Sequence, residues 1–145
     1  MLEVRPIAPE QTHALRQAVL RPHQSVHEMT YDGDAMPDAA HFGLFDGGRH
    51  VGIASVTPEP QPGVEGKGQW RVRGMAVLPE TRGTGGGRCL LEACVRHVQE
   101  VGGRIIWCNA RSSACGLYER NGFTTVGDPF DLPGIGEHYV MQRLV

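Results

Sequence analysis

An amphipathic helix pattern directly follows a strand pattern in the middle of the sequence, and this order limits the fold. Between Gly85 and Gly102 the apolar residues, including Leu90, Cys94 and Val98, recur at the spacing of one helix face, and Gly102-Gly103 supplies a helix stop. The preceding residues 70–78 form a β-rich run that Pro79 ends. Gly74 lies inside this run, where a bulge or a close backbone approach is the usual explanation. The pattern therefore predicts a strand, a glycine-rich turn and a helix in succession.

The rest of the chain alternates short strand and helix patterns. The sequence predicts strands at 2–5, 41–45, 50–56, 104–109, 123–126 and 138–144, and helices at 9–21 and 112–120. Ser112 or Ser113 is the expected N-cap of the second helix. The prolines and glycines of residues 58–68 predict a loop, and residues 22–40, which have no sustained period, predict a mobile or substrate-facing segment. We expect a mixed α/β (α+β) fold, with a largely antiparallel sheet of about seven strands flanked by helices.

Composition excludes several classes of protein. With 145 residues, 40% of them hydrophobic and 21% charged, the chain fits one globular domain over residues 1–145. The net charge of −2 argues against a nucleic-acid partner. No apolar run exceeds four residues, which argues against a membrane-spanning segment, and the first residues do not resemble a signal peptide. We therefore expect a cytoplasmic protein.

Cysteine and histidine spacing does not indicate a metal centre. Cys89, Cys94, Cys108 and Cys115 match neither paired zinc ligands nor a redox pair, so free thiols are expected. His23 and His27 have no further ligand at a recognised offset. No metal is predicted.

The turn before the central helix has the composition of an anion site. Residues 79–88 carry four glycines between Arg82 and Arg88. The free N–H groups of a helix start and its dipole favour negative charge, and glycines allow close approach. The segment does not match the P-loop or dinucleotide-binding patterns. A loose turn with solvated arginines remains the alternative interpretation at this point.

Two motifs together resemble a known family. The pattern Arg82-x-x-Gly85-x-Gly87 follows a strand ending Met75-Ala76-Val77-Leu78-Pro79, and Leu117-Tyr118-Glu119-Arg120-Asn121-Gly122-Phe123 follows a later strand. Both are similar to motifs of the GNAT (Gcn5-related N-acetyltransferase) superfamily, although Leu117 stands where the family usually has Phe. The similarity covers residues 70–126, and the order of predicted elements agrees with the family plan.

The resemblance implies acetyl-CoA as cosubstrate, in a cleft where the strands ending at Val77 and Asn109 splay apart. The implied cofactor-binding residues are Met75, Ala76, Val77, Arg82, Gly83, Thr84, Gly85, Gly86, Gly87, Arg88, Asn109 and Tyr118. Backbone groups near Met75 would hold the pantetheine arm, and residues 82–88 the pyrophosphate.

The same resemblance suggests catalytic residues. Tyr118 is the expected general acid, because its phenol can protonate a leaving thiolate. The general base is left open among Glu28, Asp32, Glu80 and His138, of which His138 is favoured because its strand should run alongside the cleft. Arg111 and Arg120 are either further phosphate contacts or exposed charges.

The leading hypothesis is an N-acetyltransferase that acts on a primary amine of a small molecule or peptide by direct attack. One alternative is a non-catalytic acyl-CoA-binding sensor domain, and another is a generic anion-binding domain. Family habit suggests a homodimer.

Overall fold

One mixed sheet of seven strands runs through the molecule in the spatial order β1-β2-β3-β4-β5-β7-β6. This arrangement comes from a computed structural model that describes residues 1–145. Every neighbouring pair of strands is antiparallel except β4 and β5. The strands are β1 (Leu2–Pro6), β2 (Ala40–Asp46), β3 (Arg49–Pro58), β4 (Gln69–Val77), β5 (Ile105–Arg111), β6 (Thr124–Leu132) and β7 (Gly136–Leu144). The predicted seven-stranded, largely antiparallel fold is confirmed.

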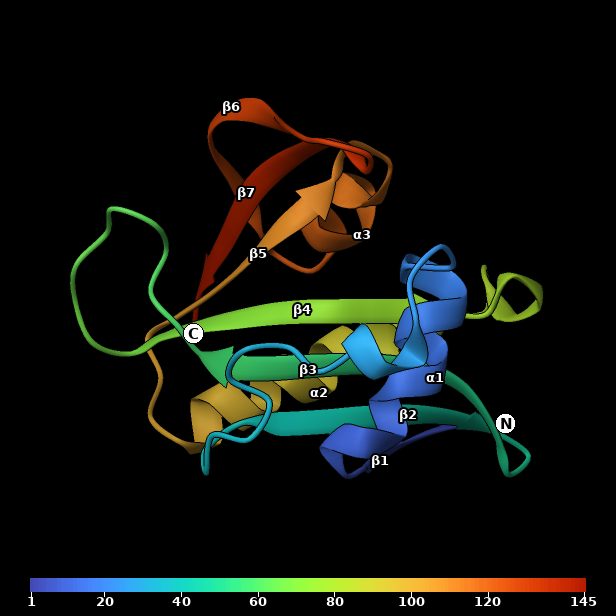
Figure 1. Cartoon of the computed structure of the whole chain (residues 1–145). Coiled ribbons are helices and arrows are strands. Elements are labelled where there is room, and N and C mark those ends of the chain that lie inside the picture. The colour runs from blue at the N-terminus through green and yellow to red at the C-terminus, as the bar shows by residue number, and fades with distance from the viewer.

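Helices cover the sheet on both faces. A continuous helical stretch is built from η1 (Pro9–Thr12), α1 (His13–Leu15) and η2 (Arg16–Leu20) and lies in front of β2–β4, whereas α2 (Gly86–Glu100) lies behind them (Figure 1). The shorter elements are η3 (Val26–Glu28), η4 (Pro79–Thr81), η5 (Ser112–Ala114) and α3 (Cys115–Arg120). Leu90, Leu91, Cys94 and Val98 of α2 are fully buried and form the main core with β2–β5. The apolar face read from the sequence is therefore the face that packs.

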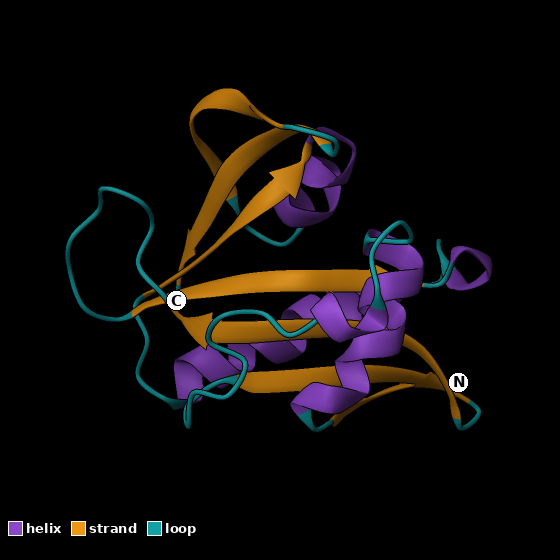
Figure 2. Cartoon of the chain, viewed as in Figure 1, coloured by secondary structure: helices purple, strands orange, loops and turns teal.

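The parallel pair β4 and β5 separates after three residues. Its pairing starts at Gln69↔Ile105 and ends at Arg71↔Trp107, although both strands continue. Beyond that point the two halves of the sheet diverge (Figure 2). The edge of β4 that faces β5 is left without a strand partner, so its backbone groups are available to a ligand.

A bulge interrupts β4 at the predicted glycine. Ile53 and Ser55 of β3 pair with Ala76 and Arg73 of β4, so two β4 residues, Gly74 and Met75, stand opposite one β3 residue. Gly74 has a φ of 66°, a conformation that a side chain would strain. The bulge turns the backbone at the point where the sheet opens.

Two local predictions need correction. Neither Ser112 nor Ser113 caps a helix: η5 and α3 have no side-chain cap, and the Ser112 hydroxyl donates to Glu137 instead. The last hairpin is longer than expected, because β6 continues to Leu132. Within residues 22–40, the segment predicted to be mobile or substrate-facing, Met29 and Asp34 are buried.

All four cysteines are free thiols. Cys94, Cys108 and Cys115 are buried, and burial raises the pKa of Cys94 and Cys108 to about 12. No helix has the length and hydropathy required to span a bilayer.

Candidate active site

A large cavity opens where β4 and β5 diverge. It has a volume of about 1030 Å³ and is bounded by β4, the glycine-rich turn, the first turn of α2 and α3. The predicted cofactor-binding residues that line it are Met75, Ala76, Val77, Arg82, Gly83, Gly85, Gly86, Gly87, Arg88 and Tyr118. Most of the predicted set is thus brought together around one space, which we call the first cavity.

The start of α2 supplies unpartnered backbone donors to the first cavity. Gly85 is the N-cap residue, with a φ of 89° and no side-chain capping bond. A Cβ at Gly85 or Gly83 would meet nothing within 4 Å, so the backbone borders open space. Gly86 differs, because a Cβ there would lie 2.5 Å from Cδ2 of the buried Leu44. Gly83 and Gly85 therefore leave the backbone N–H groups accessible from the cavity, whereas Gly86 allows α2 to pack closely against Leu44.

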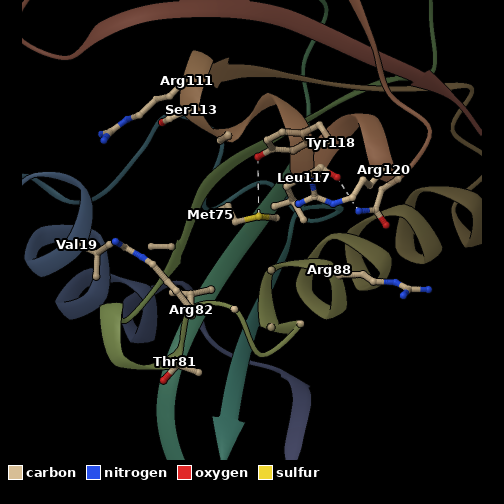
Figure 3. Close-up of a pocket in the computed structure, with 18 of the residues that line it drawn as sticks. Val19, Met75, Thr81, Arg82, Arg88, Arg111, Ser113, Leu117, Tyr118 and Arg120 are labelled. Atoms are coloured by element: carbon tan, nitrogen blue, oxygen red, sulfur yellow. Dashed lines mark hydrogen bonds between the residues drawn. The ribbon is translucent and has the colours of Figure 1, made fainter.

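The two arginines of the turn behave differently. Arg82 is exposed and has no carboxylate partner, whereas Nε of Arg88 donates to Glu92 Oε1 at 2.8 Å along α2. Figure 3 shows the two side chains extending in opposite directions from the turn. Thr84, also predicted to bind the cofactor, does not line the cavity, and its hydroxyl donates to the carbonyl of Thr81 at 2.6 Å.

Tyr118 stands at the inner end of the first cavity. Its hydroxyl donates to Sδ of Met75 at 3.9 Å, across the gap between α3 and β4 (Figure 3). Burial, followed by the nearby Cys108 thiol, raises the pKa of Tyr118 well above its usual value. The phenol therefore keeps its proton throughout the neutral range, as a proton donor must.

A second, smaller cavity of about 180 Å³ adjoins the first. The two share Leu20, Met75, Arg111, Ala114 and Tyr118 as lining residues. Asn109 and His138 also line the second cavity. Asn109 was predicted to bind the cofactor and His138 to take part in catalysis. Met75 and Tyr118 thus lie on the boundary between the two cavities.

His138 is buried and held in one orientation. Its Nδ1 lies 2.7 Å from the carbonyl oxygen of Gly136, and the ring packs against Phe130. Because a carbonyl can only accept, Nδ1 must carry the hydrogen, which leaves Nε2 free to accept a proton. The other candidate bases, Glu28, Asp32 and Glu80, are exposed and line neither cavity.

Positive charge dominates the second cavity. Its lining includes Arg21, Arg71, Arg73 and Arg111, and no aspartate or glutamate. Arg71 is paired with Glu59 at 3.0 Å, but Arg73 and Arg111 form no ion pair. Burial, followed by the charge of Arg71, lowers the pKa of Arg73. An anion in this cavity would therefore be stabilised.

The sequence motifs do not single out Arg21 and Arg73, and they leave Arg111 as either a phosphate contact or an exposed charge. Arg71 and Arg73 alternate on one face of the predicted strand, which was the available signal. No group of three or more His, Cys, Asp or Glu side chains is arranged to hold a metal ion.

Comparisons with known proteins agree with this fold. The model of the acetyltransferase (GNAT) family matches residues 8–123. The uncharacterized N-acetyltransferase YitI of Bacillus subtilis (strain 168) is 39% identical over 143 residues, covering 99% of this chain and 96% of that protein.

Two solved structures have a similar fold at lower identity. Escherichia coli ElaA superposes with a TM-score of 0.78 at 17% identity, covering 99% of each chain. The NatC complex bound to Gag peptide and CoA has a chain with a TM-score of 0.78 at 17% identity, covering 99% of this chain and 98% of that one.

The fold, the family model and the relative at 39% identity define an acyl-transferring enzyme. The chain belongs to the GNAT acetyltransferase family. The superfamily and the class of enzyme predicted from the two motifs are confirmed.

Proposed function

We propose that the protein transfers an acetyl group from acetyl-CoA to the primary amine of a small acceptor that also carries an anionic group. The observation that carries this proposal is the junction of the two cavities at Met75 and Tyr118. One cavity suits a long phosphorylated cosubstrate, and the other suits a small acceptor. The whole chain, residues 1–145, would act as one N-acetyltransferase domain.

The residues of the first cavity fit acetyl-CoA. Arg82 and the N–H groups at the start of α2 would bind the pyrophosphate. The unpaired edge of β4 beyond Arg71, re-aimed by the bulge at Gly74, would hold the pantetheine arm. The CoA bound by the NatC structure, which shares this fold, supports the assignment.

His138 and Tyr118 would move the protons of the reaction. His138 Nε2 accepts a proton from the acceptor's ammonium group, so that the amine can attack. The new C–N bond would form as the C–S bond of the thioester breaks, and Tyr118 would donate its proton to the departing sulfur. The second proton that the nitrogen loses on becoming an amide would restore the phenol, and the proton held by His138, the one that the overall reaction releases, would pass to solvent. Asn109, on β5 beside the second cavity, would position the acceptor or the cosubstrate amide.

The charge of the second cavity indicates the acceptor class. Arg73 and Arg111 have no carboxylate partner there, so a carboxylate, phosphonate or phosphate on the acceptor would satisfy their donors. A polyamine would be repelled by the same arginines.

An acyl-CoA sensor would need only the first cavity, so the adjoining second cavity favours the enzyme. A homodimer and a cytoplasmic location remain predictions.

Two measurements test the function. Calorimetric titration with acetyl-CoA, with desulfo-CoA and ATP as competitors, should show binding selective for the coenzyme. Thiol release should then be followed with amines of matched size that carry a phosphonate, a carboxylate, an amide or a second ammonium. We expect turnover with the first two, reduced by Arg73→Gln and unchanged by Arg96→Gln on the exposed face of α2. Coenzyme binding without turnover of any amine would favour the sensor, and equal binding of ATP would favour a generic anion site.

A further inference from the structure

The ring of Tyr31 lies against two guanidinium groups beside the second cavity. Cζ of Arg16 is 4.0 Å and Cζ of Arg73 is 4.3 Å from the ring centroid. Tyr31 and Arg73 both line the second cavity. The ring also packs against the β4 bulge, since a Cβ at Gly74 would lie 3.3 Å from Cε2 of Tyr31. Tyr31 thus connects the segment before β2 to the strand that carries Arg73.

The two arginines differ in how their charge is compensated. Arg16 is fully buried, and both of its terminal nitrogens donate to the Asp34 carboxylate, at 2.6 and 3.0 Å. It donates further to the Met29 carbonyl and the Ser55 hydroxyl. Arg73 has neither an ion pair nor a side-chain hydrogen bond within the protein. The aromatic ring is therefore the attractive contact that restrains Arg73.

The backbone of Tyr31 is fixed by the same buried network. Its N–H donates to Asp34 Oδ2 at 2.9 Å, and its carbonyl accepts from the Asp34 N–H at 3.1 Å. Nε2 of the buried His41 lies 2.9 Å from the Asp34 carbonyl oxygen, which ties this turn to β2. The position of the ring is thus set by contacts to β2 and to the helical stretch in front of the sheet.

An aromatic ring can restrain Arg73 without occupying its hydrogen-bond donors. A carboxylate partner would use the guanidinium donors of Arg73 and neutralise its charge. A ring attracts the flat face of the guanidinium and leaves its in-plane N–H groups free. Arg73 can then be oriented in advance while remaining able to bind an anion.

We propose that Tyr31 is a positioning residue that holds Arg73 ready to bind the anionic group of the acceptor. This proposal rests on the proposed function, because it requires an anion in the second cavity. It assigns a specificity role to residues 22–40, through the aromatic ring of Tyr31 and the buried network behind it.

The test uses 3-aminopropylphosphonate as the probe, titrated into the full chain saturated with desulfo-CoA so that the first cavity is filled. Tyr31→Leu removes the aromatic face, and Tyr31→Phe retains it. We expect Tyr31→Leu to weaken phosphonate binding about tenfold, in line with a partly desolvated cation–π contact. Tyr31→Phe should stay within about twofold of the wild type, since the ring face remains. Affinity for desulfo-CoA should be unchanged in both variants, which excludes a general structural defect.

A double-mutant cycle with Arg73→Gln isolates the coupling. If Tyr31 acts through Arg73, the two losses should be less than additive. Additive losses, or an unchanged affinity in Tyr31→Leu, would overturn the positioning role while leaving the proposed function intact. If the wild type binds the phosphonate no better than Arg73→Gln does, the anionic acceptor of the proposed function fails, and the role of Tyr31 fails with it.

Discussion

The Tyr118 hydroxyl lies 3.9 Å from Sδ of Met75, at the boundary that two cavities share. These residues come from α3 and from the bulged strand β4, which are far apart in the sequence. Their contact marks where a cosubstrate arm entering from one side and an acceptor entering from the other would meet. A proton donor at this point would suit the proposed protonation of the departing sulfur.

Replacing Tyr118 by phenylalanine should reduce kcat by about 100-fold or more, because it removes the general acid. Affinity for acetyl-CoA should stay near the wild-type value, since the ring still packs against Phe123. Steady-state kinetics and calorimetry check the two parts. Tyr139→Phe is the matched control, because Tyr139 is half-buried on β7 and lines neither cavity. Unchanged turnover in Tyr118→Phe would remove the phenol from the mechanism.

The raised pKa of Tyr118 also predicts a pH profile. A phenol whose pKa is raised stays protonated above its ordinary value of about 10, so it should not impose a loss of kcat below that pH. A decline of kcat with an apparent pKa of about 8 or 9 that disappears in Tyr118→Phe would contradict this assignment.

His138→Asn should lower kcat/KM by about 100-fold or more near neutral pH, because it removes the proton acceptor. The deficit should shrink as pH rises, since a primary amine with a pKa of about 10 then loses its proton to water without a base. Initial rates over a range of pH test this. His23→Asn, at an exposed position, is the control. A deficit that is constant at all pH values would indicate a structural role for His138.

Arg82→Ala should weaken acetyl-CoA binding about tenfold, the loss expected for a hydrogen-bonded charged contact. Arg88→Ala should change affinity by less than about threefold, since the Arg88 side chain extends along α2 toward Glu92, in the direction opposite to Arg82 (Figure 3). Calorimetry measures both, with Arg96→Ala as the control on the exposed face of α2. Equal losses would mean that Arg88 leaves Glu92 to bind phosphate.

Asp34→Asn should destabilise the fold by about 3–5 kcal/mol, because it leaves the buried Arg16 charge without its partner. Burial raises the pKa of the Asp34 carboxyl, but hydrogen bonds from Arg16 and from the Tyr31 N–H outweigh it and keep the pKa below its usual value. The stabilisation is therefore complete above about pH 4 and is lost as pH falls through the lowered pKa. Denaturant unfolding should show the gap between wild type and variant narrowing in acid.

The exposed Asp38 provides the control for that measurement. Asp38→Asn should leave the free energy of unfolding within about 0.5 kcal/mol of the wild type, as most surface substitutions do. A similar loss in both variants would mean that the buried pair is not the source of the stability.

Local patterns were enough to predict the elements that carry the first cavity. The strand over 70–78, the bulge at Gly74 and the helix after Gly85 all follow from side-chain periodicity and glycine conformation, which act over a few residues. The predicted N-cap at Ser112 is wrong because the Ser112 hydroxyl donates to Glu137 on β7, and no local pattern could predict that contact.

The second cavity depends on contacts that are distant in sequence. Arg16 and Asp34, which form the buried ion pair, are 18 residues apart. Tyr31 contacts Arg73 because the buried network around this pair holds Tyr31 beside β4. The motifs by themselves determined the family, the strand–turn–helix unit and the choice of Tyr118 as the candidate proton donor. Tertiary structure decided which arginines and which candidate base line the second cavity, because both depend on where the pairing of β4 with β5 stops and the sheet opens.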